Sequence, residues 1–365
     1  MEKNIVSICD VCSKIFAGGD APKGKFSKVK TEEYSIPIYS NGEANEGLYG
    51  YTDSYRVNVP CLTVSARGTI GYTAIRKEPF VPIVRLITLV PKTEIIDIRY
   101  LYYVMQNYKC INNGTSIPQL TVPMLKKYSF ILPEMELQIK IVEMLDKIND
   151  LYKKRKNQLE KLDELIKARF VELFGDKGYP EDTLLNLCNI IDYRGKTPEK
   201  VEYGLPFITA KNVRMHQMNL EPREYISKET YDKVMVRGFP KEGDVVFTTE
   251  APLGNVCRIP HFDTEFYIGQ RIVTLQTEKL EPIYLEYALS SDDFKTKYMG
   301  KSSGSTVTGI RVRMLEQLTI PVPPRALQEQ FAAFVEQTDK SKLAVQKSLD
   351  KLELLKKALM QKYFE

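Results

Sequence analysis

Two similar stretches decide how this chain is organised: GTSIPQLTVPMLKKYSFILP at residues 114–133 and GSTVTGIRVRMLEQLTIPVP at residues 304–323. Each runs from a Gly- and Thr-containing turn through a short apolar segment to a proline, and a long charged segment with helical spacing follows. An ordered recurrence at a nearly fixed separation is typical of a duplicated unit. The chain is therefore expected to contain one folded region and one long helix, twice over.

Earlier segments recur in the same order. Residues 11–22 (VCSKIFAGGDAP) face 187–198 (LCNIIDYRGKTP), IPIY at 36–39 faces LPFI at 205–208, and LTVSARGTIGYTAI at 62–75 faces VFTTEAPLGNVCRI at 246–259. Short β-rich runs between Gly, Pro and Asn turns predict strands, whereas 98–106 and 283–290 have helical apolar spacing. The expected fold class is α+β: two tandem pseudo-repeated domains with mixed β-strands, separated by two long helices.

Both long segments carry the alternating four- and three-residue steps of a coiled-coil seam. The first seam comprises Ile141, Leu145, Ile148, Tyr152, Arg155, Leu159, Leu162, Ile166, Arg169 and Leu173, and the second Phe331, Val335, Thr338, Lys342, Val345, Leu349, Leu352, Lys356, Leu359 and Tyr363. Prolines 133, 323 and 324 mark the helix starts, because proline is tolerated only in the first turn. Two seams in one chain are expected to pair as an antiparallel coiled coil; a dimerisation coiled coil between two chains is the alternative.

The expected division is therefore a first domain at 1–133, a first helix at 134–175, a second domain at 176–323 and a second helix at 324–365. A chain of 365 residues with 43% hydrophobic residues is long enough for two cores. No segment has the length of a membrane span, and the N-terminus lacks a signal-peptide layout, so a cytoplasmic location is expected. The net charge of +5 permits nucleic-acid binding without indicating it.

The usual signs of catalysis and metal binding are missing from the sequence. Only Cys9 and Cys12 have ligand-like spacing among six cysteines, and two histidines cannot complete a zinc site, so no metal site is expected. Neither a P-loop nor a dinucleotide-binding glycine motif occurs. An Asn/Asp-Pro-Pro-Tyr/Phe methyltransferase motif is also missing, and no catalytic residue is predicted.

The helix starts carry a family likeness. ILPEMELQIKIV at 131–142 and VPPRALQEQFAAFV at 322–335 each combine a strand, prolines and a Leu-x-x-Gln-type segment before a long helix that ends in Leu-Phe or Tyr-Phe. This doubled pattern resembles the specificity subunit of type I restriction-modification systems over essentially the whole chain. One departure is expected in the first copy, where Leu137 takes the place of Glu329.

The resemblance implies two target-recognition domains, each reading one half of a bipartite, asymmetric DNA target. The helices would set the spacing and dock the modification subunits. Implied partners are double-stranded DNA, two modification (methyltransferase) subunits and restriction (translocase-nuclease) subunits, with no membrane. No cofactor is expected in this chain, whereas S-adenosylmethionine, ATP and Mg would belong to the partner subunits.

Bases are read by polar and basic side chains on loops that reach the major groove. Glu250 is suited to accept a hydrogen bond from cytosine N4. The DNA-binding candidates in the first domain are Lys23, Lys25, Ser40, Asn41, Ser65, Arg67, Thr115 and Ser116. Those in the second are Arg194, Lys196, Lys211, Asn212, Arg214, Thr248, Thr249, Glu250, Gln270, Arg271, Ser302, Ser305 and Thr306.

Two other functions remain open at this point. One is a Mg-dependent DNA endonuclease of the same fold with Glu250 in its centre, although such a centre needs two or more convergent carboxylates. The other is a coiled-coil scaffold protein. A scaffold would show neither salt-dependent nor sequence-dependent DNA binding.

Overall fold

The computed structural model describes residues 4–108, 119–193, 197–302 and 308–364. It consists of two compact units. Unit 1 comprises Met1–Asn157 together with Gln346–Glu365, and unit 2 comprises Gln158–Val345. Each unit thus contains part of both long helices.

Unit 1 is built on an antiparallel sheet with the strand order β2-β8-β5-β6, beside a smaller sheet with the order β4-β3-β7. β3 pairs parallel with β7 and antiparallel with β4. Strands β1 and β9 form a separate pair where the chain enters and leaves the globular region. The elements are β1 Ile5–Ser7, α1 Ile8–Val11, β2 Cys12–Ala17, β3 Ile36–Tyr39, η1 Ala44–Gly47, β4 Leu48–Thr52, β5 Cys61–Val64, β6 Thr73–Arg76, β7 Val81–Pro82, β8 Ile87–Pro91, α2 Ile98–Asn107, α3 Val122–Lys126 and β9 Ser129–Ile131.

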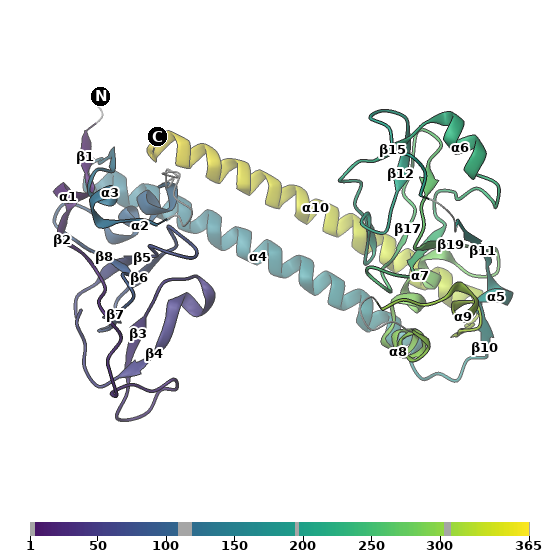
Figure 1. The fold of residues 1–365 in the computed structure, drawn as a ribbon, viewed down its shortest axis with the longest axis horizontal. Coiled ribbons are helices and arrows are strands. Elements are labelled where there is room, and N and C mark those ends of the chain that lie inside the picture. Colours follow the sequence, from purple (N-terminus) through teal and green to yellow (C-terminus); the bar gives the residue numbers. More distant parts are fainter. Residues whose placement is uncertain (1–3, 109–118, 194–196, 303–307, 365) are drawn as a thin grey trace. The chain divides into compact units, whose positions relative to one another are not determined.

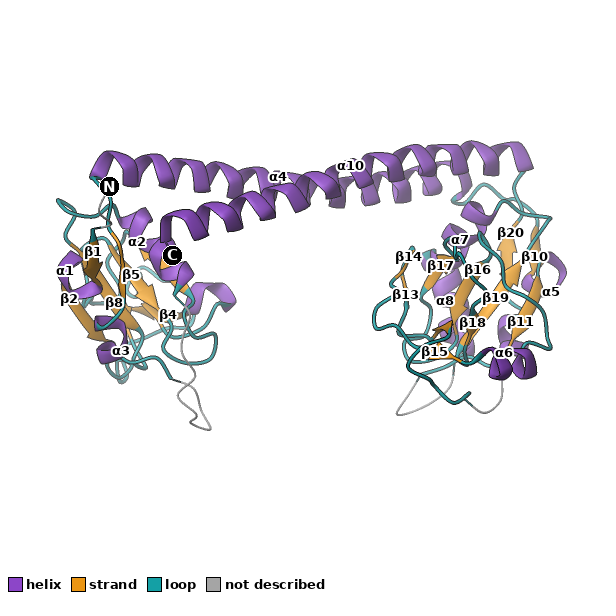
Figure 2. Ribbon diagram, turned by 90° about the horizontal axis from the view of Figure 1, so that it is seen from above, coloured by secondary structure: helices purple, strands orange, loops and turns teal. Residues whose placement is uncertain are grey.

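Unit 2 repeats this plan with a sheet ordered β11-β19-β16-β17, a smaller sheet β15-β12-β18 and the pair β10-β20 (Figure 2). Here too the middle strand of the smaller sheet pairs parallel on one side, with β18, and antiparallel on the other, with β15. The elements are β10 Glu181–Thr183, α5 Leu184–Leu187, β11 Asn189–Asp192, β12 Leu205–Ile208, β13 Val213–Arg214, β14 Gln217–Met218, β15 Tyr225–Ile226, α6 Lys228–Val234, β16 Val245–Thr248, β17 Val256–Arg258, β18 Tyr267–Ile268, β19 Ile272–Gln276, α7 Pro282–Ser290, α8 Asp292–Lys301, α9 Val312–Leu315 and β20 Thr319–Pro321. The predicted α+β pseudo-repeat is confirmed.

The hairpins β5–β6 and β16–β17 give the register of the repeat. The N–H of Gly71 donates to the carbonyl of Ser65, and the N–H of Gly254 donates to the carbonyl of Thr248, both at 2.9 Å. Both glycines have a left-handed backbone, with φ of 85° and 89°. Ser65 is therefore equivalent to Thr248, so the segments 62–75 and 246–259 as paired from sequence are out of register by one residue.

The long helices are α4, Met135–Phe174, and α10, Arg325–Phe364, which agree with the predicted segments to one residue at each end (Figure 1). In unit 1 the first turns of α4 share a core with the last turns of α10, where the Phe364 ring stacks on Tyr100 with centroids 5.1 Å apart. In unit 2 the last turns of α4 meet the first turns of α10, and Phe170 packs against Phe331 at 5.4 Å. The two helices therefore pair in the antiparallel sense.

Burial along the α4 seam is uneven. Ile141, Leu145 and Ile166 are buried, but Tyr152 is 40% exposed and Arg155 is also exposed. The α10 seam is buried at Phe331, Val335, Thr338, Val345 and Leu349 and half-buried at its other predicted positions. A heptad pattern reports helical spacing, whereas burial also requires an apolar partner at each level of the pair.

A buried glutamine fastens the start of each long helix to the globular region. The Gln138 side chain accepts from the Asp97 N–H at 2.9 Å and donates to the Pro133 carbonyl at 2.8 Å. The Gln328 side chain makes the equivalent bonds, to the Glu281 N–H at 2.9 Å and the Pro323 carbonyl at 2.7 Å. Ile139, which follows Gln138, is therefore the residue equivalent to Glu329, which follows Gln328. The sequence-based assignment of that place to Leu137 is wrong.

Replacing Gln328 by leucine should destabilise unit 2 by about 1–3 kcal/mol, because two buried backbone groups lose their partners while the buried volume is largely kept. Hydrogen exchange of the amides in β16 and β19 would measure the loss. Gln330→Leu, two residues along on the exposed side of α10, is the control and should change little. Equal protection in both variants would show that the glutamine bonds contribute nothing net.

Candidate nucleic-acid interface

Loop cluster 1 is the set of turns at residues 40–42, 65–71, 84–86 and 119–121, gathered at one end of the main sheet of unit 1. Asn41 connects them: its Nδ2 donates to the Val84 carbonyl at 2.6 Å, and its Oδ1 accepts from the Ala66 N–H at 2.7 Å. The Leu120 N–H donates to the Ala66 carbonyl at 3.0 Å. Segments that are distant in sequence thus form one polar surface.

Loop cluster 2 is the corresponding set in unit 2, residues 249–254, 269–271 and 308–311. The Thr249 N–H donates to the Arg271 carbonyl at 2.8 Å, and the Ile310 N–H donates to the Thr249 carbonyl at 2.9 Å. Glu250 forms an ion pair with Arg271 at 3.5 Å. Gln270 donates to Thr197 Oγ1 at 3.1 Å, which adds the loop after β11 to the cluster.

Both clusters place non-glycine residues in the left-handed backbone region. Arg85 has φ of 62°, Arg271 has φ of 69°, and Ala251 has φ of 47° where the equivalent residue of unit 1 is Gly68. Such conformations cost of order 1–3 kcal/mol and concentrate at functional sites. An arginine recurs at the strained position in both units although its surroundings differ.

The candidates of unit 1 fall into two groups. Ser65 is 1% exposed and its Oγ accepts from the Gly42 N–H at 2.9 Å, and Asn41 holds two loops together, so these two side chains build the surface. Arg67 is exposed and donates to Gln119 Oε1 at 3.0 Å. Lys25 is exposed and lies 3.6 Å from Asp53. Lys23 is exposed and Ser40 half-buried.

The candidates of unit 2 divide in the same way. Thr248 is fully buried and bonds Asn255, and Asn212 is 2% exposed and closes its own turn by accepting from the Thr209 N–H at 2.9 Å. The buried position of both argues against base contact. The accessible candidates are Lys211, Arg214, Thr249, Glu250, Gln270, Arg271 and Ser302, of which Ser302 donates to the Met299 carbonyl at 2.8 Å. Thr115, Ser116, Arg194, Lys196, Ser305 and Thr306 lie outside the described residues.

Sequence reasoning missed Arg85, which is exposed and belongs to loop cluster 1. The parallel strand pairs identify it. The Ile83 N–H donates to the Tyr39 carbonyl at 2.9 Å, and the Gly269 N–H donates to the Ile208 carbonyl at 2.8 Å. Ile83 and Gly269 are therefore equivalent, and so are Arg85 and Arg271, which follow them by two residues. Aligning the segments PIVR (82–85) and IGQR (268–271) of the two halves would have revealed Arg85 as the counterpart of Arg271.

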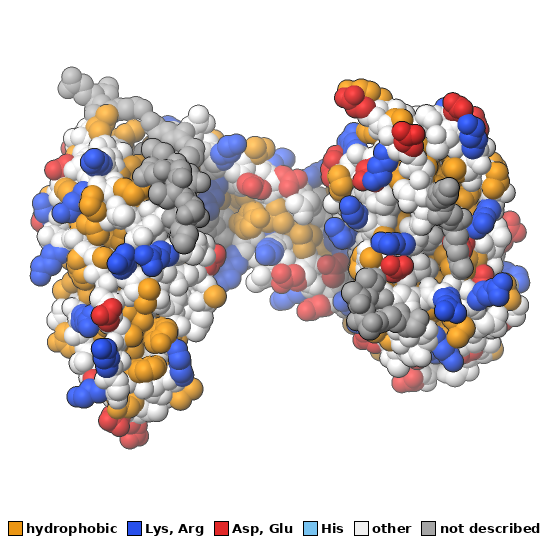
Figure 3. All heavy atoms as spheres, viewed as in Figure 1, with side chains coloured by type: hydrophobic (Ala, Val, Ile, Leu, Met, Phe, Trp, Pro, Cys, Tyr) orange, Lys and Arg blue, Asp and Glu red, His pale blue; other side chains and the backbone are white. Residues whose placement is uncertain are grey.

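The charged surface is mixed in sign. Figure 3 shows Lys and Arg side chains scattered among hydrophobic and acidic ones on the visible face of each unit. Such a surface fits the modest net charge of +5 and gives no broad single-sign field. Any nucleic-acid contact must therefore depend on particular side chains rather than on bulk attraction.

Metal-type donors do not converge in the part of the chain that the structure describes: no group of three or more His, Cys, Asp or Glu side chains could hold an ion there. Burial raises the pKa of the Cys12 thiol to about 12, which keeps this half of the Cys9–Cys12 pair protonated. Within the same residues, no helix combines the length and the apolar character needed to span a bilayer.

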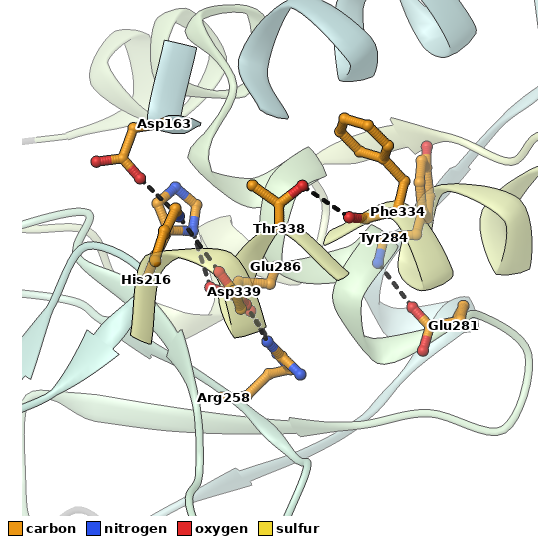
Figure 4. A network of polar contacts seen from close by, with 10 residues as sticks. Asp163, His216, Arg258, Glu281, Tyr284, Glu286, Phe334, Thr338 and Asp339 are labelled. Atoms are coloured by element: carbon orange, nitrogen blue, oxygen red, sulfur yellow. Dashed lines mark hydrogen bonds and ion pairs between the residues drawn. The ribbon is translucent and has the colours of Figure 1, made fainter. Parts of the chain in front are cut away.

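A polar network in unit 2 joins the globular region to the long helices (Figure 4). The Glu286 side chain, 2% exposed, contacts His216 Nδ1 at 2.8 Å and Arg258 Nε at 2.6 Å. Arg258 also approaches Asp339 on α10 at 3.9 Å. Lys342 continues the network from Asp339 at 3.3 Å to Asp163 on α4 at 2.6 Å. It thus fixes the β13–β14 and β17 segments, α7 and both helices of unit 2 to one another.

Comparison with known proteins gives a consistent picture. The family model described as "Type I restriction modification DNA specificity domain" matches residues 2–161 and 181–354. A putative type I specificity subunit of Mycoplasma pneumoniae is 36% identical over 151 residues, which cover 41% of this chain and 44% of that protein. A second from the same organism is 34% identical over 145 residues, covering 40% of this chain and 39% of that protein. These two matches span less than half of each relative.

The matches that cover most of the chain have lower sequence identity. The MjaIX type I restriction enzyme specificity subunit of Methanocaldococcus jannaschii is 23% identical over 383 residues, covering 96% of this chain and 87% of that protein. The crystal structure of a type I restriction-modification S subunit from M. genitalium covers 100% of this chain and 97% of its own, with a TM-score of 0.61 and 16% identity. At that identity the likeness concerns the fold.

Proposed function

Since the chain belongs to the type I restriction-modification DNA specificity family, we propose that it is the sequence-reading, non-catalytic subunit of a type I restriction-modification complex. Each unit would read one half of a bipartite, asymmetric target in double-stranded DNA. The paired helices would set the spacing between the halves and dock the modification subunits.

The presence of two equivalent loop clusters with different side chains supports this proposal most directly. Equivalent backbone positions carry Arg67 in one cluster and Glu250 in the other, so two similar scaffolds present different hydrogen-bonding groups. Base identity in the major groove is read through such donors and acceptors. Two scaffolds with different groups suit a target whose halves differ in sequence.

The partners and cofactors follow from the same proposal. Two modification subunits would carry S-adenosylmethionine, and restriction subunits would bring ATP and Mg for translocation and cleavage, in the cytoplasm. An endonuclease in this chain is disfavoured, because Glu250 pairs with Arg271 and the described residues contain no group of three or more His, Cys, Asp or Glu side chains that could hold an ion. A scaffold role would leave the polar loop clusters without a purpose.

Methylation mapping tests the function. The chain should co-purify with the modification subunit encoded beside it, and DNA exposed to that complex and S-adenosylmethionine should acquire methyl groups at one split, asymmetric motif. Stable assembly without a methylated motif would overturn the reading function. Cleavage by the chain alone with Mg²⁺ would instead establish the nuclease.

Binding of the complex to its motif should weaken by about 1,000-fold or more between 50 and 200 mM salt if roughly six phosphates are contacted, because each neutralised phosphate releases counterions. The preference for the motif over unrelated DNA should nevertheless remain about 1,000-fold or higher. Fluorescence anisotropy over a salt series measures both quantities. A flat salt response would contradict DNA binding through this surface.

A further inference from the structure

The two loop clusters can be superposed residue by residue through their backbone bonds. The carbonyls of Ala66 and Thr249 accept from the N–H groups of Leu120 and Ile310, at 3.0 and 2.9 Å. These two carbonyls therefore occupy one place in the repeat. The residues that follow them, which begin the turns of the β5–β6 and β16–β17 hairpins, are equivalent.

Those following residues are Arg67 and Glu250, and they have opposite charge. Arg67 uses one nitrogen, Nη2, on Gln119, which leaves most of its five N–H donors without a partner among the described residues. Glu250 uses Oε1 on Arg271, and its side chain remains 38% exposed. Loop cluster 1 thus presents a hydrogen-bond donor positioned by Gln119, where loop cluster 2 presents an acceptor positioned by Arg271.

Arg85 and Arg271 also occupy equivalent positions, but unlike Arg67 and Glu250 they are the same residue type. Both are exposed, and both adopt the left-handed backbone. The turn around Arg85 is closed by backbone bonds, with the Val84 N–H donating to the Gly19 carbonyl at 2.8 Å, so the guanidinium is not needed to form it. A residue that is the same in two domains with different base-reading groups suits a contact that carries no base information, and phosphate is such a contact.

We propose that Arg67 and Glu250 are the base-discriminating pair of this subunit, and that Arg85 and Arg271 bind backbone phosphates beside them. Arg67 donates two hydrogen bonds to the O6 and N7 acceptors of a guanine in one half-site. Glu250 accepts from the N4 amino group of a cytosine in the other half-site, while Arg271 holds the carboxylate in place. This assignment rests on the proposed function.

The test uses the complex of the full chain with its modification subunit and maps methylation on a randomised double-stranded DNA library. Arg67→Ala should lower the preference for guanine at one position of one half-site by about 5- to 150-fold and leave the other half-site unchanged. Glu250→Ala should do the same for a cytosine in the other half-site. Arg67→Lys keeps the charge but removes the fork of donors, and it should also lose the preference.

Arg85→Ala should keep the motif and weaken binding to all sequences, with the salt slope smaller by about one. Arg271→Ala should weaken binding in the same way and, because Arg271 holds the Glu250 carboxylate, should also lower the cytosine preference that Glu250 provides. Lys92→Ala and Lys279→Ala are the matched controls, because these lysines, half-buried Lys92 and exposed Lys279, follow β8 and β19 at the ends away from the loop clusters. Both controls should behave as the unmodified complex does. Thermal unfolding of each variant, expected within a few degrees of the unmodified chain, shows that the fold is retained.

The outcomes separate two failures. If the unmodified complex methylates no split motif, the proposed function fails. If it methylates one and Arg67→Ala and Glu250→Ala leave every position of that motif unchanged, the function stands and the assignment of these residues is overturned. A change at the same half-site in both variants would also overturn it.

Discussion

Glu286→Leu should destabilise unit 2 by about 3 kcal/mol, near the lower end of the 3–5 kcal/mol that breaking a buried ion pair costs. The carboxylate is 2% exposed and serves both His216 and Arg258. Leucine would leave the Arg258 guanidinium, one-third exposed, without its main counter-charge, and water would offset part of the loss. Chemical denaturation followed by hydrogen exchange in unit 2 measures the change.

The chain supplies a matched control for this variant. His261 and Glu242 form the same type of contact at the same 2.8 Å, but both side chains are exposed. Glu242→Leu should therefore have little effect, because water replaces the partner. The double variant Glu286→Leu with Arg258→Met should recover most of the stability. Equal effects of Glu286→Leu and Glu242→Leu would refute a role for burial.

Phe174→Ala should also cost about 3–5 kcal/mol in unit 2, the usual range for removing a buried aromatic ring. The ring is 4% exposed and packs against Tyr284 at 4.8 Å and Phe331 at 5.6 Å. The equivalent Phe364→Ala should destabilise unit 1 instead, because Phe364 stacks on Tyr100. Hydrogen exchange resolved by unit distinguishes the two variants.

Val171→Ala is the control, since this neighbouring side chain is 63% exposed. It should leave both units unchanged within about 0.5 kcal/mol. If Phe174→Ala lowered protection in unit 1 as strongly as in unit 2, the assignment of each helix end to one unit would be wrong.

The duplicated architecture could be predicted because it depends on periodicity and order, which a sequence displays directly. Heptad spacing predicted both long helices, prolines 133, 323 and 324 marked their starts, and the repeated segments predicted the two α+β units. The register was harder to predict. A one-residue offset in the β16 hairpin became visible only through the backbone bonds of Gly71 and Gly254.

The loop residues were predictable in type but not in role. Ser65 and Thr248 look like exposed loop hydroxyls in the sequence, yet both are buried and bind backbone groups. The hydrogen-bond partner of Ser65 is Gly42, 23 residues away in the chain, and no local sequence pattern predicts that hydrogen bond. Arg85 was missed for a related reason, since its strained backbone and its counterpart in the second half appear only when strands are paired.

The assignment of the last turns of α10 to unit 1 has a consequence for synthesis. Asn107 donates to the carbonyl of Phe364, 257 residues later, so the core of the first globular region stays incomplete until translation reaches that residue. Unit 2 ends earlier in the chain, at Val345. The region made second can therefore fold first on the ribosome, while the region made first must wait with part of its apolar surface uncovered, which is the condition that favours chaperone capture.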